Sequence, residues 1–174
     1  MIQGSKIRLR VISREDLSEL ESWNRNLELR SSYNNFGLQP TNSLEHRFAD
    51  DGLIGTRFGT LLVVLPDGTM VGDVSYHQER YGPNDGSTAY NIGIELMPDY
   101  RGKGYGVEAQ KLLADYLFST YPVMRIEAST DVENIPEQRA LEKAGFTREG
   151  VMRKAQWRGG DYHDIVLYSK LRGE

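Results

Sequence analysis

The sequence predicts an α/β fold, because segments with the two-residue period of a strand alternate with segments that have the period of a helix. Ile92, Ile94 and Leu96 alternate with other residues, as in a strand with one aliphatic face. The turn sequence at 66–68, Pro-Asp-Gly, lies between two β-rich runs and predicts a hairpin. A helix is indicated by apolar residues spaced at i, i+3, i+4, i+7 and i+8, namely Ala109, Leu112, Leu113, Tyr116 and Leu117. With 174 residues and no repeat or linker, we expect one domain over residues 1–174.

The N-terminal third predicts a strand, a helix and a segment with two short helices. Residues 5–11 alternate aliphatic and basic side chains and predict a strand. Ser13 is a suitable cap for a helix whose apolar face carries Leu17, Leu20 and Trp23. Further on, we expect one short helix over Leu27, Leu29, Tyr33 and Phe36, and another after Pro40 with Ser43, Glu45, Arg47 and Phe48.

The rest of the chain predicts strands on either side of two helices. The hairpin runs are 59–65 and 70–77, and a polar loop over 79–88 leads into the central strand. After the central helix, residues 123–130 predict a strand. Asn134 opens a helix with Pro136 in its first turn and Glu137 three residues on, and Gly145 ends it; two final strands follow, near 147–157 and 163–171.

The turn between the central strand and helix has the composition of a phosphate-binding loop. Gly102, Gly104 and Gly106 let the backbone approach a ligand, and the helix that follows offers unpaired N–H groups at the positive end of its dipole. Arg101 and Lys103 add two cations. The expected ligand is therefore a polyanion.

Spacing separates three glycine motifs of this kind. A P-loop is excluded because no Lys-Ser/Thr pair follows the glycines. A dinucleotide fingerprint is weakened, since Val107 stands where its third glycine belongs, although acids follow at Glu127 and Asp131. The pattern Arg/Gln-x-x-Gly-x-Gly/Ala is met in full by residues 101–106. A nucleotide-dependent oxidoreductase that uses the glycine turn as a dinucleotide site is therefore the alternative function to the one that the third motif indicates.

This third motif resembles the coenzyme A pyrophosphate loop of the GNAT acetyltransferases. Residues 134–146 resemble the second motif of that family, an Asn that opens a short helix ending in Gly-Phe. Residues 149–153 and 160–168 resemble the closing strands of the RimJ/RimL branch, the ribosomal-protein alanine N-acetyltransferases. The resemblance implies a single-domain GNAT fold, with a mixed, mostly antiparallel sheet whose central strands splay apart and are flanked by helices.

The resemblance also implies acetyl-CoA as cofactor and an amine as acetyl acceptor. The loop backbone would bind the pyrophosphate. The end of the central strand and Asn134 would bind the pantetheine, and two cations of the second helix would bind the nucleotide phosphates. The implied cofactor residues are Leu96, Met97, Arg101, Gly102, Lys103, Gly104, Tyr105, Gly106, Asn134, Arg139 and Lys143. The implied acceptor wall lies in the variable segment after the first helix, with Tyr33, Asn34, Asn35, Phe36 and His46.

Two carboxylates are candidates for catalysis. Glu95 occupies a position on the central strand where the family often has a base. The usual acid, a Tyr shortly before Gly-Phe, is replaced by Leu141 and Glu142, and Glu137 stands where RimL-like enzymes have a Ser. Glu137 would serve as an acid only if burial raised its pKa well above about 4.3. The RimL-like branch can also place an acid at a position occupied here by Gln156.

These residues predict direct acetyl transfer to a primary amine in a ternary complex. The departures at Glu137 and Gln156 favour a small-molecule amine, such as an amino sugar, antibiotic or polyamine, over the N-terminal α-amine of a ribosomal protein. A non-catalytic acyl-CoA sensor remains an alternative. The sequence does not decide the oligomeric state, although a homodimer is frequent in such families.

Composition excludes several other classes of site and partner. The chain has no cysteine, so disulfides and a catalytic thiol are excluded, and its three histidines lack ligand spacing, so we expect no metal. A net charge of −4 argues against general nucleic-acid binding. We expect a cytoplasmic protein with no membrane partner, because no apolar run approaches a membrane span or signal peptide.

Overall fold

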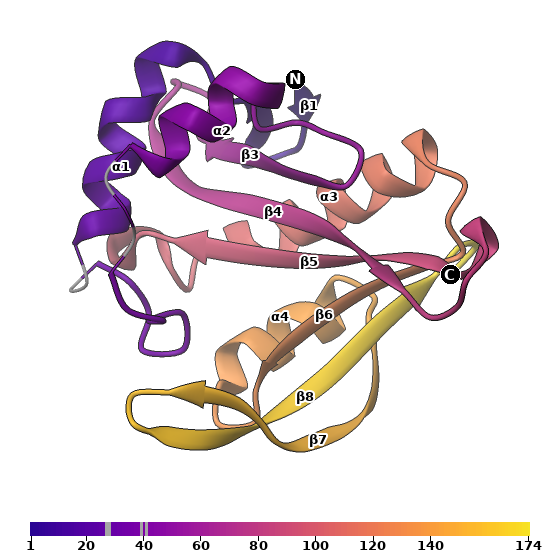
Figure 1. Ribbon diagram of the computed structural model, residues 1–174. Coiled ribbons are helices and arrows are strands. Elements are labelled where there is room, and N and C mark those ends of the chain that lie inside the picture. Colours follow the sequence, from indigo (N-terminus) through magenta and orange to yellow (C-terminus); the bar gives the residue numbers. More distant parts are fainter. Residues whose placement is uncertain (27–28, 39, 41) are drawn as a thin grey trace.

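The computed structural model describes residues 1–26, 29–38, 40 and 42–174. Within these residues the strands form one eight-stranded sheet in the order β1-β2-β3-β4-β5-β6-β8-β7 (Figure 1). The strands are β1 (Ile2–Gln3), β2 (Arg8–Val11), β3 (Phe58–Val64), β4 (Met70–Arg80), β5 (Thr88–Leu96), β6 (Arg125–Asp131), β7 (Thr147–Arg158) and β8 (Asp161–Leu171). The α-helices are α1 (Leu17–Arg25), α2 (Ser43–Asp51), α3 (Tyr105–Thr120) and α4 (Ile135–Lys143), and short 3₁₀ turns are η1 (Arg14–Asp16), η2 (Asp85–Ser87) and η3 (Pro98–Tyr100).

The sheet is mixed and mostly antiparallel, and its one parallel contact between described strands is short. β5 and β6 pair in parallel only at Tyr90↔Ile126, Asn91↔Glu127 and Ile92↔Ala128. Beyond these pairs β5 continues to Leu96 and β6 to Asp131 without pairing with each other, although β5 stays paired with β4 and β6 with β8. The two central strands therefore separate toward their C-terminal ends, which confirms the splayed sheet expected from the sequence.

Helices cover both faces of the sheet, and β3 shows how the two cores are divided. Leu61 and Val63 face the larger core, where the buried side chains of α3 and α4 pack on the sheet. Leu62 and Val64 face a second core that they share with α1 and α2. This alternation follows from the two-residue period of a strand that is buried on both faces.

The central helix forms where its apolar spacing predicts it. Ala109, Leu113 and Leu117 are completely buried, while Leu112 and Tyr116 pack against the same core from its margin. Removing these faces from water stabilises the helix more than its intrinsic propensity does.

Most of the expected elements are confirmed, including the 66–68 hairpin, the helix after Asn134 and the two C-terminal strands. The first strand is shorter than expected and begins at Arg8, and β1 was not anticipated. The short helix expected between the first helix and Pro40 was wrong for residues 29–36, which are irregular; Leu27 lies outside the described residues. Ser31 and Asn34 in this segment bond to β5, which competes with helical hydrogen bonds.

β7 is an edge strand of the sheet, and its pairing with β8 is interrupted. β7 pairs only with β8, and its register shifts between Met152 and Gln156. Lys154 lies in the bulge with φ of 51°, and its N–H donates to Asp164 Oδ1 (2.8 Å). The bulge bends β7 before it reaches Trp157.

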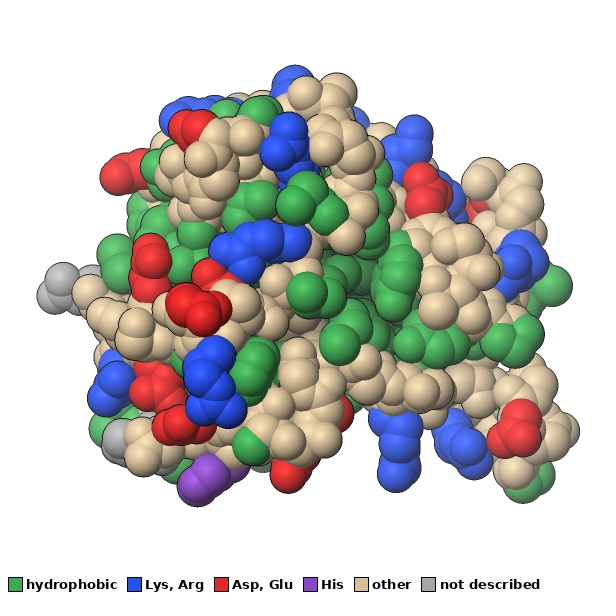
Figure 2. All heavy atoms as spheres, turned by 90° about the horizontal axis from the view of Figure 1, so that it is seen from above, with side chains coloured by type: hydrophobic (Ala, Val, Ile, Leu, Met, Phe, Trp, Pro, Cys, Tyr) green, Lys and Arg blue, Asp and Glu red, His purple; other side chains and the backbone are tan. Residues whose placement is uncertain are grey.

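The surface above α1 and α2 carries charges of both signs. Acidic and basic side chains are interspersed there, with apolar side chains between them (Figure 2). None of the helices in the described residues is both long and apolar enough to cross a lipid bilayer.

Candidate active site

The glycine loop joins β5 to α3 through left-handed backbone. Gly102 has φ of 73° and Gly104, which caps α3, has φ of 84°. These values favour glycine, because a Cβ would strain both positions. The first turn of α3 leaves its N–H groups without intrahelical partners and directs its positive dipole end into the loop. The loop therefore has the backbone features of an anion site.

The two expected cations at the loop, Arg101 and Lys103, contact groups of the protein itself. Arg101 bends back to bond the carbonyls of Leu96 (Nε to O, 2.8 Å) and Leu29 (Nη2 to O, 3.2 Å). Lys103 lies with its Nζ 5.2 Å from the Tyr100 ring centroid. The ammonium of Lys6, which sequence reasoning missed, donates to Lys103 O (3.4 Å). Arg101 thus connects the end of β5 to the segment after α1, and Lys6, which precedes β2, adds a positive charge at the loop.

Asn134 is the N-cap residue of α4. Its Oδ1 accepts from Glu137 N (3.4 Å), which confirms the cap, and its Nδ2 donates to Thr130 Oγ1 (3.0 Å). Arg139 and Lys143 are exposed on α4. Their contact with nucleotide phosphates stays a prediction.

The backbone at the end of β5 is partly occupied. Met97 donates its N–H to Val71 O (2.9 Å), so this amide faces β4 rather than the opening beside β6. Leu96 O accepts from Arg101, and Ile94 O accepts from Asn34 Nδ2 (3.4 Å). Of the two residues expected to meet pantetheine, only Leu96 directs its backbone toward β6.

Glu95 projects from the face of β5 that α1 covers. Its carboxylate lies 3.7 Å from Arg30 Nε and accepts from Ser31 N (3.4 Å). Its cross-strand partner is Asp73, and both line a small cavity of about 20 Å³ with Trp23 and other residues of that face. Burial, together with the charge of Glu95, raises the pKa of Asp73 to about 7. The Nε and Nη1 of Arg30 are buried without a hydrogen-bond acceptor among the residues that the structure describes.

Glu137 lies between α3 and α4 on the other side of the sheet. Burial raises its pKa to about 7, against a smaller opposing effect of a hydrogen bond from Gln110. Gln110 is itself fully buried on α3 and donates to Gly106 O (3.2 Å). Glu137 therefore has the raised pKa that a role as proton donor requires.

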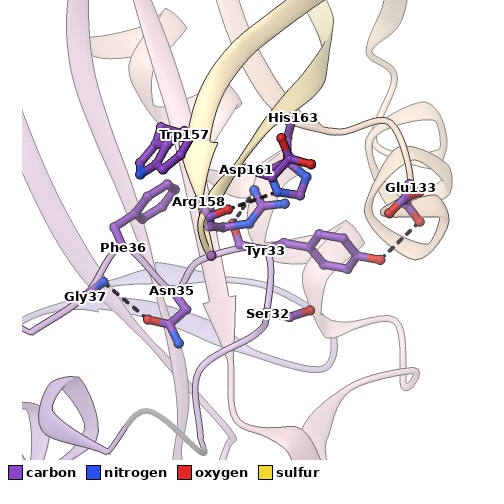
Figure 3. Close-up of a pocket in the computed structure, with 11 residues that line it drawn as sticks. Ser32, Tyr33, Asn35, Phe36, Gly37, Glu133, Trp157, Arg158, Asp161 and His163 are labelled. Carbon is purple, nitrogen blue, oxygen red and sulfur yellow. Dashed lines mark hydrogen bonds between the residues drawn. The ribbon is translucent and has the colours of Figure 1, made fainter.

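A cavity of about 790 Å³ opens between the segment after α1 and the turn joining β7 to β8. Trp157 and Phe36 lie at one side of it and Tyr33 and Glu133 at the other (Figure 3). The remaining lining residues are Ser32, Asn35, Gly37, Arg158, Gly159, Asp161 and His163.

The structure brings together three of the five predicted acceptor residues. Tyr33, Asn35 and Phe36 line the cavity. Asn34 contacts β5 next to it, through Ile94 O. His46 is exposed on α2 and does not line the cavity.

Arg158, which lines this cavity, belongs to a buried ion pair that was not anticipated. Arg158 Nη2 donates to Asp131 Oδ2, and both side chains are almost fully buried. His163 Nδ1 lies 3.1 Å from the same Asp131 oxygen. Although burial opposes it, hydrogen bonds from Glu133 N and Arg158 hold the pKa of Asp131 below its usual value. Arg158 also donates to Tyr33 O (3.4 Å), so the pair connects the β7–β8 turn to the acceptor segment.

These missed residues had weak signals in the sequence. Asp73 lies on the face of the hairpin opposite Val74, and the register with β5 makes it a neighbour of Glu95. Trp157, Arg158 and Asp161 border a predicted turn that was assigned no function. Their meeting with the segment after α1 depends on tertiary packing rather than on spacing.

The family description "Acetyltransferase (GNAT) domain" matches residues 6–147. Among curated proteins, the uncharacterized N-acetyltransferase YnaD of Bacillus subtilis is 36% identical over 89 residues, which cover 51% of this chain. The match spans about half the length of that relative, 52%.

Two solved structures show the same fold over nearly the whole chain. A spermidine N-acetyltransferase from Vibrio cholerae, in complex with CoA and spermine, superposes with a TM-score of 0.82 at 22% identity and covers 97% of each chain. An acetyl transferase from Salmonella typhimurium that modifies the N-terminal serine of ribosomal protein L7/L12 superposes with a TM-score of 0.76 at 19% identity and covers 98% of each chain. The family match over residues 6–147 shows that the chain belongs to the GNAT acetyltransferase family, whose acetyl donor is acetyl-CoA.

Proposed function

We propose that the protein transfers an acetyl group from acetyl-CoA to a primary amine, which attacks the donor directly in a ternary complex. The observation that carries the proposal is the opening between β5 and β6, which pair over only three residues and then diverge beside a loop of free helix N–H groups. A carboxylate, Glu95, projects from β5 on one side, and Glu137 lies at α4 on the other. Donor and acceptor would therefore meet between two groups that can carry protons.

The residues fit the acetyl donor in three places. The backbone of residues 102–106 suits a pyrophosphate, because left-handed glycines and a helix N-terminus expose N–H groups there. Leu96 directs its backbone N–H toward the opening, while its carbonyl accepts from Arg101. The side-chain amide of Asn134 has one hydrogen that is not used in its bond to Thr130. When bound, acetyl-CoA supplies the activated acetyl group as a thioester.

Glu95 is proposed as the base. An amine attacks only in its neutral form, and a lysine-like amine with a pKa near 10.4 is roughly a thousandth neutral at physiological pH. An α-amino group, with a pKa near 7.8, is roughly a quarter neutral, a difference of about 3.5 kcal/mol. Glu95 would accept the proton of the ammonium at its carboxylate, directly or through water.

Glu137 is proposed as the acid. A carboxyl group whose pKa is near neutrality keeps its proton in a useful fraction of molecules at pH 7. Glu137 would donate this proton from its carboxyl oxygen to the sulfur of the leaving group. The hydrogen bond with Gln110 would orient the carboxyl for that transfer.

The cavity supports a small-molecule acceptor. Its volume of about 790 Å³ falls within the range of about 300–1,000 Å³ that holds small ligands. The CoA- and spermine-bound structure of the Vibrio cholerae relative is consistent with an amine of this size. A protein N-terminus is the second candidate, favoured by the exposure of Trp157 and Phe36 at the cavity, 59% and 53%, and by the likeness to the ribosomal-protein enzyme.

The first test is ligand binding followed by turnover. Acetyl-CoA at about 100 times its Kd should add about 2.7 kcal/mol of stability and raise the Tm by roughly 5–10 °C, while NAD should not. Release of free thiol is then followed with a panel of small amines and of peptides with free N-termini. A Tm shift with NAD alone would overturn the proposal. Coenzyme binding without turnover on any amine would favour the non-catalytic sensor instead.

A further inference from the structure

The cavity beside the predicted reaction site combines aromatic rings with unpaired carboxylates. Trp157 and Phe36 present largely exposed rings to it, and Glu133 and Asp161 contribute two acidic side chains (Figure 3). We infer that the acceptor carries a second positive charge, which this cavity binds between the two rings and the two carboxylates. The inference rests on the proposed function and names its substrate class as an amine with a distal cation.

The charges of the lining favour a cation. Arg158, the guanidinium in the wall, is neutralised by its buried ion pair with Asp131, whose other oxygen accepts from Glu133 N. Neither Glu133 nor Asp161 has an ion-pair partner among the described residues; Asp161 accepts only the backbone N–H of Tyr162 (2.7 Å). The cavity is thus left with a net negative charge, which attracts ammonium groups and repels carboxylates.

The aromatic rings add a second, independent preference. The face of Tyr33 is already taken by Arg158, whose Cζ lies 5.6 Å from the ring centroid, and the Tyr33 hydroxyl donates to Glu133 O (3.2 Å). Trp157 is held by an edge contact with Tyr162, at a centroid distance of 4.9 Å, and keeps 59% of its surface exposed. An indole fixed in this way, in a cavity that two carboxylates also line, offers an ammonium a cation–π contact.

The cavity and the proposed base are joined by one stretch of chain. Ser31 donates its N–H to Glu95, and the next two residues, Ser32 and Tyr33, line the cavity. An acceptor whose reacting nitrogen lies at Glu95 would therefore extend along residues 31–33 toward Trp157. An amine with a single positive charge would leave Glu133 and Asp161 without a cationic partner.

The test compares three probes of equal chain length: 1,4-diaminobutane, 1-aminobutane and 4-aminobutanoate. Binding to the protein with coenzyme A is measured by calorimetry, and acetylation by thiol release from acetyl-CoA. We expect the diamine to have a Kd and KM at least about fivefold below those of 1-aminobutane, with 4-aminobutanoate weakest. Equal values for the diamine and 1-aminobutane, or binding of none of the three, would overturn the inference. Selective binding of the diamine without acetylated product would uphold the inference and contradict the proposed function.

Substitutions in the cavity test the contacts one by one. Glu133→Gln and Asp161→Asn should each raise the KM of the diamine by up to about fivefold, and Trp157→Leu by about two- to fivefold, with little effect on 1-aminobutane. Asp85→Asn is the matched control, since Asp85 is 98% exposed in the β4–β5 turn, at the opposite end of the sheet from the β7–β8 turn (Figure 1). Each variant must keep the Tm increase with acetyl-CoA. If Asp85→Asn changed the diamine preference as much as Asp161→Asn, the effect would be one of overall charge, and the inference would fail.

Discussion

Two carboxylates, Asp73 and Glu95, lie side by side on neighbouring strands, where burial and like charge disfavour ionisation of Asp73. Asp73 and Glu95 are cross-strand partners on the face covered by α1, and Arg30 is the cation beside them. With the pKa of Asp73 raised to about 7, this side chain gains its charge across neutral pH. As the pH rises through neutrality, Asp73 therefore adds a negative charge beside Glu95, which favours a cationic amine at this pair.

Glu95→Gln should lower the kcat for a lysine-like amine by about 10²-fold or more, because the base is lost. The loss should be smaller for an α-amino group, which needs less deprotonation. The affinity for acetyl-CoA should not change, and calorimetry checks it. Unchanged turnover would remove Glu95 from the mechanism.

Glu137→Gln should change stability in a pH-dependent way as well as slow transfer. A carboxyl whose folded pKa lies near 7 binds a proton that the unfolded chain releases near pH 4.3, so its contribution to stability falls as the pH rises from about 4 to 7. The variant lacks this decline. The difference in free energy of unfolding between the variant and the wild type is measured by urea unfolding at pH 5 and pH 8. We expect this difference to favour the variant by on the order of 1 kcal/mol more at pH 8 than at pH 5. A constant difference between the two proteins at both pH values would contradict the raised pKa.

At the scale of elements, the β5–α3 loop depends on backbone conformation more than on side chains. Its two expected cations are engaged elsewhere, Arg101 with two carbonyls and Lys103 with Tyr100. The sequence placed the loop correctly because glycine spacing controls the backbone directly. It did not predict the bonds of the Arg101 side chain, because an arginine's direction depends on distant carbonyls, here Leu29 O; contact of Arg101 with the coenzyme stays a prediction.

Gly102→Ala should weaken binding of acetyl-CoA by about tenfold or more, since a residue with φ of 73° would strain and shift the loop amides. Gly68→Ala is its matched control. Gly68 has φ of 92°, and a Cβ at either position meets no atom within 4 Å. Both variants should lose about 1 kcal/mol of stability, measured by urea unfolding. Only Gly102→Ala should lose coenzyme affinity; equal losses of affinity would point to a global effect.

At the scale of the molecule, the sheet consists of two parts that meet along three residue pairs. Strands β1 to β5 form one part and β6 to β8 the other. The sequence predicted both parts well, because hairpin turns, helix caps and apolar periods are local. It did not predict the cavity wall, since the ion pair of Asp131 and Arg158 and its bond to Tyr33 join three distant segments.

Coenzyme binding should tie these two parts together. Amide hydrogen exchange of residues 129–131 in β6 and of residues 93–96 in β5 should slow on addition of acetyl-CoA, because the ligand would occupy the opening between them. The β3–β4 turn at 66–68 serves as the internal control and should exchange at the same rate. Protection confined to the β5 side would mean that the ligand does not bridge the opening.

The bulge in β7 bears on whether this edge of the sheet can pair with another copy of the chain. β7 is the outer strand next to β8, and it exposes Val151 and Met152, so an unbroken β7 would offer a template for the strands of other copies. The register shift after Met152, with Arg153 and Lys154 in the bulge, breaks that template into short stretches and adds charge to it. Straightening this edge by deleting the bulge residues would favour aggregation through β7. We therefore expect the register shift that precedes Trp157 to limit pairing between copies of the chain along this edge.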